Sequence, residues 1–337
     1  MTIRRFALLA VQIAVLVLVV VYGGARYFTQ MPGTPHEGPL PPLTAEEKDL
    51  IPSLRQHVEA LAAHERNISH YEGLEKAARH IEDTLQSHGC VIGRQAYTVN
   101  GKSVRNIDAV IEPAPGVSNP EVLVIGAHYD SAIGTPGANN NATGTAALLE
   151  LSRLLANLKG QINKRIRLVF FVNEEPPYFQ TENMGSVRYV RALAEQKERV
   201  VAMYSLETLG YYSSEPRSQK YPMLLDLVLP DRGDFVAFFG LFGSRALVRR
   251  SVEAFRTRQA FPSVGGVGPS IIPGITWSDH WAFAKKRIPA VMITGTAHFR
   301  YPHYRQLTDT PEKIDFGKLA RVTKGIEAVV RDAVGPR

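Results

Sequence analysis

Apolar residues near the start of the 337-residue chain form one nearly unbroken run. It extends from Phe6 to Ala25, with Arg4 and Arg5 before it and Arg26 after it. About 20 consecutive apolar residues are enough to cross a bilayer as a helix. The run is longer than the apolar part of a signal peptide and has no clean small-residue cleavage site, which favours an uncleaved anchor over residues 1–28.

The charges that flank this run predict its orientation. Two arginines precede it and one nearby arginine follows it, so the excess of positive charge favours a cytoplasmic N-terminus. We therefore expect a single-pass protein anchored in the lipid bilayer through residues 6–25, with its main domain periplasmic or extracellular.

A proline-rich segment follows the anchor. Between Met31 and Leu43 the sequence holds five prolines and two glycines. This composition favours an extended chain and opposes packing as helix or sheet. We expect residues 29–43 to form a linker, acting as a spacer, and residues 44–337 to form the domain.

The domain begins with helical periodicity and then changes to short apolar strands separated by helices. Thr44 and Glu47 form a capping-box signature ahead of an apolar stripe that continues to Leu61. Further helices are predicted at 74–87, 143–158, 186–195, 244–255 and 316–334, and strands at 94–99, 104–111, 122–126, 166–172, 201–206, 235–239 and 290–294. This alternation predicts an α/β fold with a mostly parallel central sheet covered by helices on both faces.

Composition narrows the chemistry. A single cysteine, Cys90, excludes a disulfide framework and a cysteine-rich zinc module, so His, Asp and Glu must hold any metal. The net charge of +7 lies in short clusters without a groove-reading motif, so nucleic acid is not an expected partner. No Gly-x-Ser-x-Gly elbow follows a strand, which argues against a serine hydrolase.

Polar groups follow three of the predicted strands at their carboxyl ends, where α/β folds form their sites. They are His128 with Asp130, Glu174 with Glu175, and Glu207. Taken singly, each has an ordinary structural explanation as a surface histidine or a solvated loop. Their shared position favours a site for Zn²⁺, which accepts nitrogen and oxygen ligands.

Six strings of residues, in order, resemble the motifs of metallopeptidase family 28. They are Gly126 to Asp130, Gly137 to Gly144, Asn173 to Glu175, Ser205 to Glu207, Ser278 to His280 and Thr308 to Lys313. The resemblance covers the chain from about Glu65 to the C-terminus. It implies the zinc exopeptidase fold of a family that contains aminopeptidases with two zinc ions and glutamate carboxypeptidase II. The single-zinc glutaminyl cyclases are structural relatives.

The resemblance implies a role for each residue. His128 would bind the first zinc, Asp130 would hold its other ring nitrogen, and Glu207 would be the acidic ligand of that zinc. Glu174 would be the general base, and Glu175 would bind the second zinc.

Two positions depart from the family pattern. Asn140 stands where an aspartate bridges both metals, and Arg305 stands where the last histidine ligand is expected. A guanidinium has no lone pair to offer a metal. Together the two changes add two positive charges, the charge of one Zn²⁺. We hypothesise that Arg305 occupies the second metal position and pairs with Glu175, leaving one zinc ion or none; His303 is an alternative ligand.

Three functions remain open at this stage. The first is a zinc exopeptidase of the aminopeptidase type, acting on the N-terminal residues of peptides, with activity impaired by the two replacements. The second is a pseudoenzyme that binds a peptide or partner. The third is a cyclase, although the positions that bind zinc in those relatives correspond to Asn140, Glu175 and Arg305. Loops at 211–220 and 261–272 are expected to shape specificity.

Overall fold

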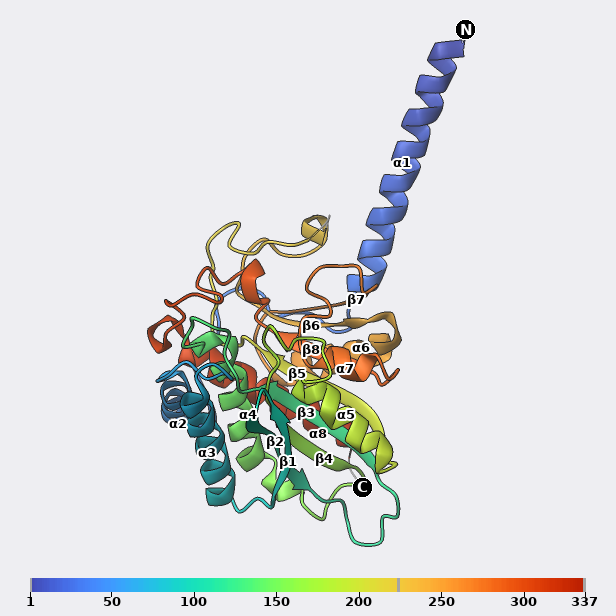
Figure 1. Ribbon diagram of the computed structural model, residues 1–337. Helices are drawn as coiled ribbons and strands as arrows, with labels where there is room; N and C mark the ends of the chain where they lie inside the picture. Colours follow the sequence, from blue (N-terminus) through green and yellow to red (C-terminus); the bar gives the residue numbers. More distant parts are fainter. Residues whose placement is uncertain (1, 223–224, 336–337) are drawn as a thin grey trace.

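The computed structural model describes residues 2–222 and 225–335, whose centre is an eight-stranded sheet (Figure 1). The strands are β1 (Ile92–Val99), β2 (Lys102–Ile111), β3 (Glu121–His128), β4 (Arg165–Phe171), β5 (Arg199–Glu207), β6 (Val236–Leu241), β7 (Ser263–Gly268) and β8 (Ala290–Thr294). Their order is β1-β2-β4-β3-β5-β8-β6-β7.

The sheet is mixed. Strands β4, β3, β5 and β8 run parallel at its centre, whereas β1, β2 and β4 pair antiparallel at one edge and β6 pairs antiparallel with β8 near the other. The prediction of a mostly parallel sheet is therefore right for the centre and too simple for the edges. The β1–β2 hairpin turns at Asn100 and Gly101, which both adopt positive φ, as the Asn-Gly signal predicts.

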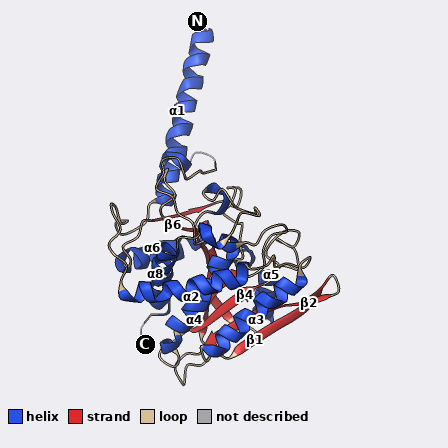
Figure 2. Ribbon diagram, turned by 90° about the vertical axis from the view of Figure 1, so that its left-hand side faces the viewer, coloured by secondary structure: helices blue, strands red, loops and turns tan. Residues whose placement is uncertain are grey.

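Helices cover both faces of the sheet. One face carries α2 (Ala45–Ala62), α3 (Tyr71–Ser87), α4 (Thr143–Leu154), α6 (Arg245–Arg258) and α8 (Phe316–Val334), and the other carries α5 (Gly185–Glu195) and α7 (His280–Ala284). Figure 2 looks onto α2 and α3 in front of the strands. Short helical turns are η1 (Ala138–Ala142), η2 (Ala156–Leu158), η3 (Leu225–Leu227), η4 (Phe242–Ser244), η5 (Ala297–Phe299) and η6 (Pro311–Lys313). The capping box at Thr44 and Glu47 is present, with reciprocal hydrogen bonds of 3.2 and 2.9 Å.

Strand β7 lies where the sequence predicts only a loop. Its residues include Gly265 and Gly266, which have no side chain to signal a strand. A Cβ at Gly265 would lie 2.8 Å from Val252 and 2.9 Å from Met31. Glycine is needed there because neighbouring side chains fill the space above the strand.

The N-terminal helix α1 (Thr2–Thr29) projects away from the rest of the chain (Figure 1). Over the residues that the structure describes, no helix has the length and apolarity expected of a membrane span. The predicted span 6–25 lies partly outside these residues, since the side chains at 7, 9, 10, 14, 17 and 20 are not described.

The proline-rich segment is neither helix nor strand, as predicted, but it is not a free spacer. Arg256 donates hydrogen bonds to the carbonyls of Pro32 and Gly33, both at 2.9 Å, and Arg321 donates to the carbonyl of Pro41 at 2.7 Å. Met31 and Leu40 pack against the main hydrophobic core. Residues 30–43 are therefore fastened along the surface of the domain.

Candidate active site

The carboxyl ends of three central strands bring the predicted catalytic residues together. His128 is the last residue of β3, Glu207 is the last residue of β5, and Glu174 follows β4. His128 Nε2 lies 3.4 Å from a carboxylate oxygen of Glu207 and 3.7 Å from one of Glu174. All three side chains are buried, and together they form the group of described residues with the spacing to hold a metal ion.

The His128 ring is held so that one nitrogen remains free. Nδ1 lies 3.2 Å from the backbone carbonyl of Asp130 and 3.4 Å from its carboxylate. Nε2 is buried without a hydrogen-bond partner among the described residues. A buried imidazole nitrogen left open beside two carboxylates is an arrangement that a cation would complete.

Asp130 has a second role that the sequence did not reveal. Its two carboxylate oxygens accept hydrogen bonds from the backbone N–H groups of Glu174 and Glu175, at 3.1 and 3.0 Å. One carboxylate thus fixes both the histidine ring and the loop that carries the two glutamates.

Glu207 is oriented by a pair of buried hydroxyls. Ser278 Oγ donates to the Glu207 carboxylate at 3.0 Å, and Ser205 Oγ lies 2.7 Å from Ser278 Oγ. The Ser278-Asp279-His280 string therefore contributes one member directly to the site. Asp279 is fully buried, and burial raises its pKa to about 7.

Asn140 is buried beside Glu175. Its Nδ2 donates to Glu175 at 2.5 Å, while its Oδ1 is buried without a hydrogen-bond partner among the described residues. Asp309 holds the turn by accepting from the backbone N–H groups of Asn139 and Asn140, at 2.8 and 3.1 Å. The side chain at this position therefore offers a neutral oxygen and not a carboxylate.

Arg305 forms an ion pair with Glu175 and lies over the ring of Tyr304, 5.1 Å from its centroid. The Glu175 side chain is 2% exposed and that of Arg305 is 39% exposed, so the arginine covers the carboxylate from the solvent side. Burial raises the pKa of Glu175, and the adjacent guanidinium opposes that rise. His303, the alternative ligand, is turned away in a 2.8 Å hydrogen bond to Thr308.

Glu174 is a buried carboxyl group whose surroundings favour the protonated form. Burial raises its pKa well above the usual range, and the nearby carboxylates of Glu175 and Glu207 raise it further against the opposing effect of His128. A carboxyl group whose pKa is raised toward neutrality is suited to accept and return a proton.

Sequence reasoning missed Arg66, which is fully buried behind the site. It donates to the carbonyls of Tyr129 at 2.7 Å and Gly137 at 2.8 Å, and thereby ties the strand end that carries His128 to the turn that carries Asn140. No local pattern marks this arginine, since these two partners lie 63 and 71 residues away along the chain.

A histidine and two acidic residues that converge at the strand ends of a parallel-centred α/β sheet form an arrangement suited to binding a metal ion. The chain belongs to Peptidase family M28, whose profile matches residues 106–330.

Two curated relatives show the range of similarity. The chain is 37% identical over 273 residues to the uncharacterized protein YfbL of Escherichia coli, covering 78% of this chain and 81% of that protein. It is 31% identical over 146 residues to the aminopeptidase YwaD of Bacillus subtilis, covering 43% of this chain and 30% of that protein. The chain thus spans under a third of that aminopeptidase.

Solved structures share the fold. An aminopeptidase from Aneurinibacillus sp. strain AM-1 has a TM-score of 0.68 at 17% identity, covering 87% of this chain and 96% of that one. BSAP, a zinc aminopeptidase from Bacillus subtilis, has a TM-score of 0.67 at 15% identity, covering 87% and 97%. Fimbriiglobus ruber glutaminyl cyclase has a TM-score of 0.62 at 19% identity, covering 89% and 99%.

Proposed function

We propose that the protein is a membrane-anchored exopeptidase that removes N-terminal residues from peptides with one zinc ion rather than two. The observation that carries this proposal is the asymmetry of the site. His128 Nε2 is open beside Glu207 and Glu174, whereas Glu175 is already paired with Arg305.

His128 and Glu207 would hold the zinc ion, with the neutral Asn140 Oδ1 in support. When bound, zinc lowers the pKa of a coordinated water to about 7 and so makes it a nucleophile at neutral pH. Glu174 accepts the proton of the attacking water and returns it to the leaving amine. Asp130 keeps the histidine tautomer and the Glu174 loop in place while this happens.

Membrane attachment is supported by the exposure of the N-terminal helix. Phe6, Leu8, Val11 and Leu16 on α1 are all well exposed to solvent. A helix that displays large apolar side chains in this way needs an apolar environment. We place the N-terminus in the cytoplasm and the domain in the periplasm or outside the cell; protease digestion of intact cells tests this topology.

The second candidate is a pseudoenzyme that binds peptides without cleaving them. It is favoured by the loss of anionic and imidazole ligands at Asn140 and Arg305. A site that retained only the cleft would still present Glu174 and Glu207 to a peptide ammonium group.

Elemental analysis of the full chain, with aminoacyl-amide hydrolysis measured before and after zinc addition, separates the two candidates. We expect about one zinc per chain and zinc-dependent turnover. Glu174→Gln should lower kcat by about 100- to 10,000-fold while zinc stays bound. The matched control is Glu182→Gln, because that side chain is exposed and pairs only with Arg191. Absence of both zinc and turnover in the unaltered chain would favour the pseudoenzyme.

A further inference from the structure

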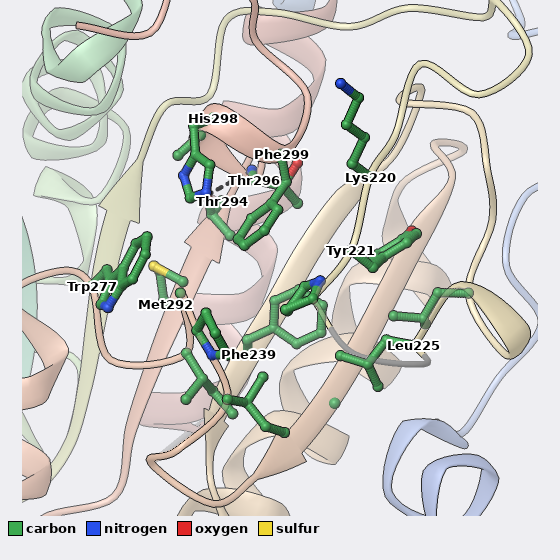
Figure 3. Close-up of a pocket in the computed structure, with 18 of the residues that line it drawn as sticks. Lys220, Tyr221, Leu225, Phe239, Trp277, Met292, Thr294, Thr296, His298 and Phe299 are labelled. Carbon is green, nitrogen blue, oxygen red and sulfur yellow. Dashed lines mark hydrogen bonds between the residues drawn. The ribbon is translucent and has the colours of Figure 1, made fainter. Parts of the chain in front are cut away.

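A cavity, drawn in Figure 3, has Glu207 of the proposed active site among the residues that line it. Glu207 and Tyr304 line it at the catalytic end, and Thr29, the last residue of α1, lines it elsewhere. The cavity therefore connects the proposed chemistry with the base of the N-terminal helix.

The walls of this cavity are apolar. Side chains that surround it in Figure 3 include Phe239, Trp277, Met292 and Leu225, which come from separate strands and loops. Among the described residues that line it, only Glu207 and Lys220 carry a full charge. Because burying a charge without a partner is costly, the interior favours an uncharged occupant.

The C-terminal end of α1 packs closely against the strands that border the cavity. A Cβ at Gly266 would lie 3.2 Å from the Phe239 ring and 3.4 Å from Thr29, so strands and helix meet closely there. Arg249 donates to the carbonyl of Gln30 at 2.8 Å, and the rings of Phe28 and Phe242 lie 4.7 Å apart. The cavity thus keeps a fixed place relative to α1.

Large apolar side chains near the cavity are exposed to solvent. Ile271 is 80% exposed, Leu227 is 55% exposed and Trp277 is 47% exposed. Leu227 belongs to η3 and Ile271 follows β7, and Figure 1 places both elements on the side of the domain from which α1 leaves. An apolar molecule held in the bilayer around α1 would meet this rim first.

We propose that the cavity holds a long alkyl chain carried by the substrate residue whose carbonyl group is attacked. This inference rests on the proposed exopeptidase function and assigns its substrate class: peptides whose first residue bears a lipid chain, taken from the membrane surface. The lining includes Glu207 and Tyr304 at one end and Thr29 at the base of α1, so an alkyl chain attached next to the reacting carbonyl group would lie among apolar side chains between them. Each buried methylene should tighten binding about 3- to 4-fold.

The two tryptophans of the chain allow a binding test that needs neither zinc nor turnover. Trp277 lines the cavity, whereas Trp281, a residue of α7, packs against the core cluster on that face of the sheet. The variant Trp281→Phe therefore leaves Trp277 as the only tryptophan to report binding. The probes are 2-amino-ω-bromoalkanamides with side chains of about 4 and about 12 carbons, added to the full chain in nanodiscs of unbrominated phosphatidylcholine. Bromine quenches tryptophan fluorescence on contact.

We expect the long probe to quench Trp277 saturably and to bind at least about 100-fold more tightly than the short one. Val267→Phe, which fills the cavity, should weaken the long probe by about 10-fold or more. Leu229→Phe is a second filling variant on a less buried wall, and exposed Leu307→Phe, outside the cavity lining, is the matched control. Thermal unfolding checks that each variant is folded.

Equal affinity for the two probes, or quenching unchanged in both folded filling variants, would overturn the proposal. A second experiment replaces the lipid of the nanodisc with brominated phosphatidylcholine and omits the probe. If that lipid quenches Trp277 without probe, and Val267→Phe removes that quenching, the occupant is a bilayer lipid and the substrate assignment is wrong. Zinc content and amide hydrolysis are measured separately. If the proposed hydrolysis fails, the quenching data still decide whether the cavity binds the long alkyl chain.

Discussion

The two halves of the active site contain buried carboxylates, and they differ in the source of the positive charge that would balance them. In one half, His128 Nε2 lies near Glu174 and Glu207 and has no hydrogen-bond partner in the part of the chain that the structure describes, and a cation from solution would complete it. In the other half, Glu175 is satisfied from within the chain by Arg305 and by the amide of Asn140. A buried carboxylate needs a counter-charge, and either a metal ion or a guanidinium can supply it.

Under the proposed function, Arg305 takes the place of a second metal ion and leaves Glu175 paired. Arg305 supplies a fixed positive charge beside Glu175, so the acidic cluster does not depend on a second ion for its stability. It cannot polarise a water as zinc does, because its five N–H groups only donate. The second half is therefore suited to support the fold and the first half to perform chemistry.

Removing a ligand from each half should have very different effects on zinc. His128→Gln should weaken zinc binding by at least about 100-fold. Structural zinc sites bind with a free energy of roughly 10–16 kcal/mol, to which about four ligands contribute, so losing one ligand removes several kcal/mol. Glu175→Gln should change the dissociation constant for zinc by less than about 3-fold. Competition titration with a chromogenic chelator measures both. Equal losses in the two variants would show that both halves bind the metal.

Restoring the family ligands should convert the second half into a metal site. Asn140→Asp combined with Arg305→His should bind a second zinc about 100-fold more tightly than either single variant, because the bridging anion and the imidazole act together. Zinc titration followed by calorimetry counts the ions. If neither the double variant nor the singles differ from the unaltered chain, the cation-replacement hypothesis is wrong.

Breaking the ion pair should test its structural value. Arg305→Met leaves Glu175 buried without its cation and should lower the free energy of unfolding by about 2 kcal/mol, less than for a fully buried pair because Arg305 is partly exposed. Adding Glu175→Gln should recover most of that loss, since no buried charge remains. Urea denaturation of the four forms gives the coupling energy, and a coupling near zero would contradict the pairing.

Zinc and protons should compete for His128. Burial opposes its charge, but the carboxylates of Glu174 and Glu207, with Asp130, raise its pKa well above the usual range. Below that pKa zinc must displace a proton, so zinc affinity should rise about 10-fold per pH unit as pH increases. Calorimetry in buffers of different ionisation heat counts the released proton. Glu174→Gln should lower the His128 pKa and move this dependence to lower pH; an unchanged profile would count against it.

Several parts of this protein could be predicted from sequence because their signals are local. The capping box at Thr44 and the Asn100-Gly101 turn are set by neighbouring residues. The placement of His128, Glu174 and Glu207 at strand ends follows from apolar runs that stop immediately before them. The pairing of Arg305 with Glu175 was inferred from a resemblance and a charge count, and the structure places the two side chains in contact.

Other features could not be predicted, because their partners are distant in sequence. Ser278 orients Glu207 across 71 positions, and Arg66 joins loops on both sides of the site. Strand β7 was mistaken for a loop because its glycines make room for Met31 rather than presenting side chains of their own. The proline-rich segment has a composition that predicts extension, and only the placement of Arg256 and Arg321 shows where it is fastened.

The sequence by itself determined most of the strands and helices, the family and the chemical groups available to the site, because periodicity and motifs are properties of neighbouring residues. The tertiary structure alone decided which nitrogen of His128 stays open, that Ser278 orients Glu207, and that an apolar cavity links Glu207 to the base of α1. Those outcomes depend on distances between residues far apart in the chain, which packing sets and local sequence does not encode.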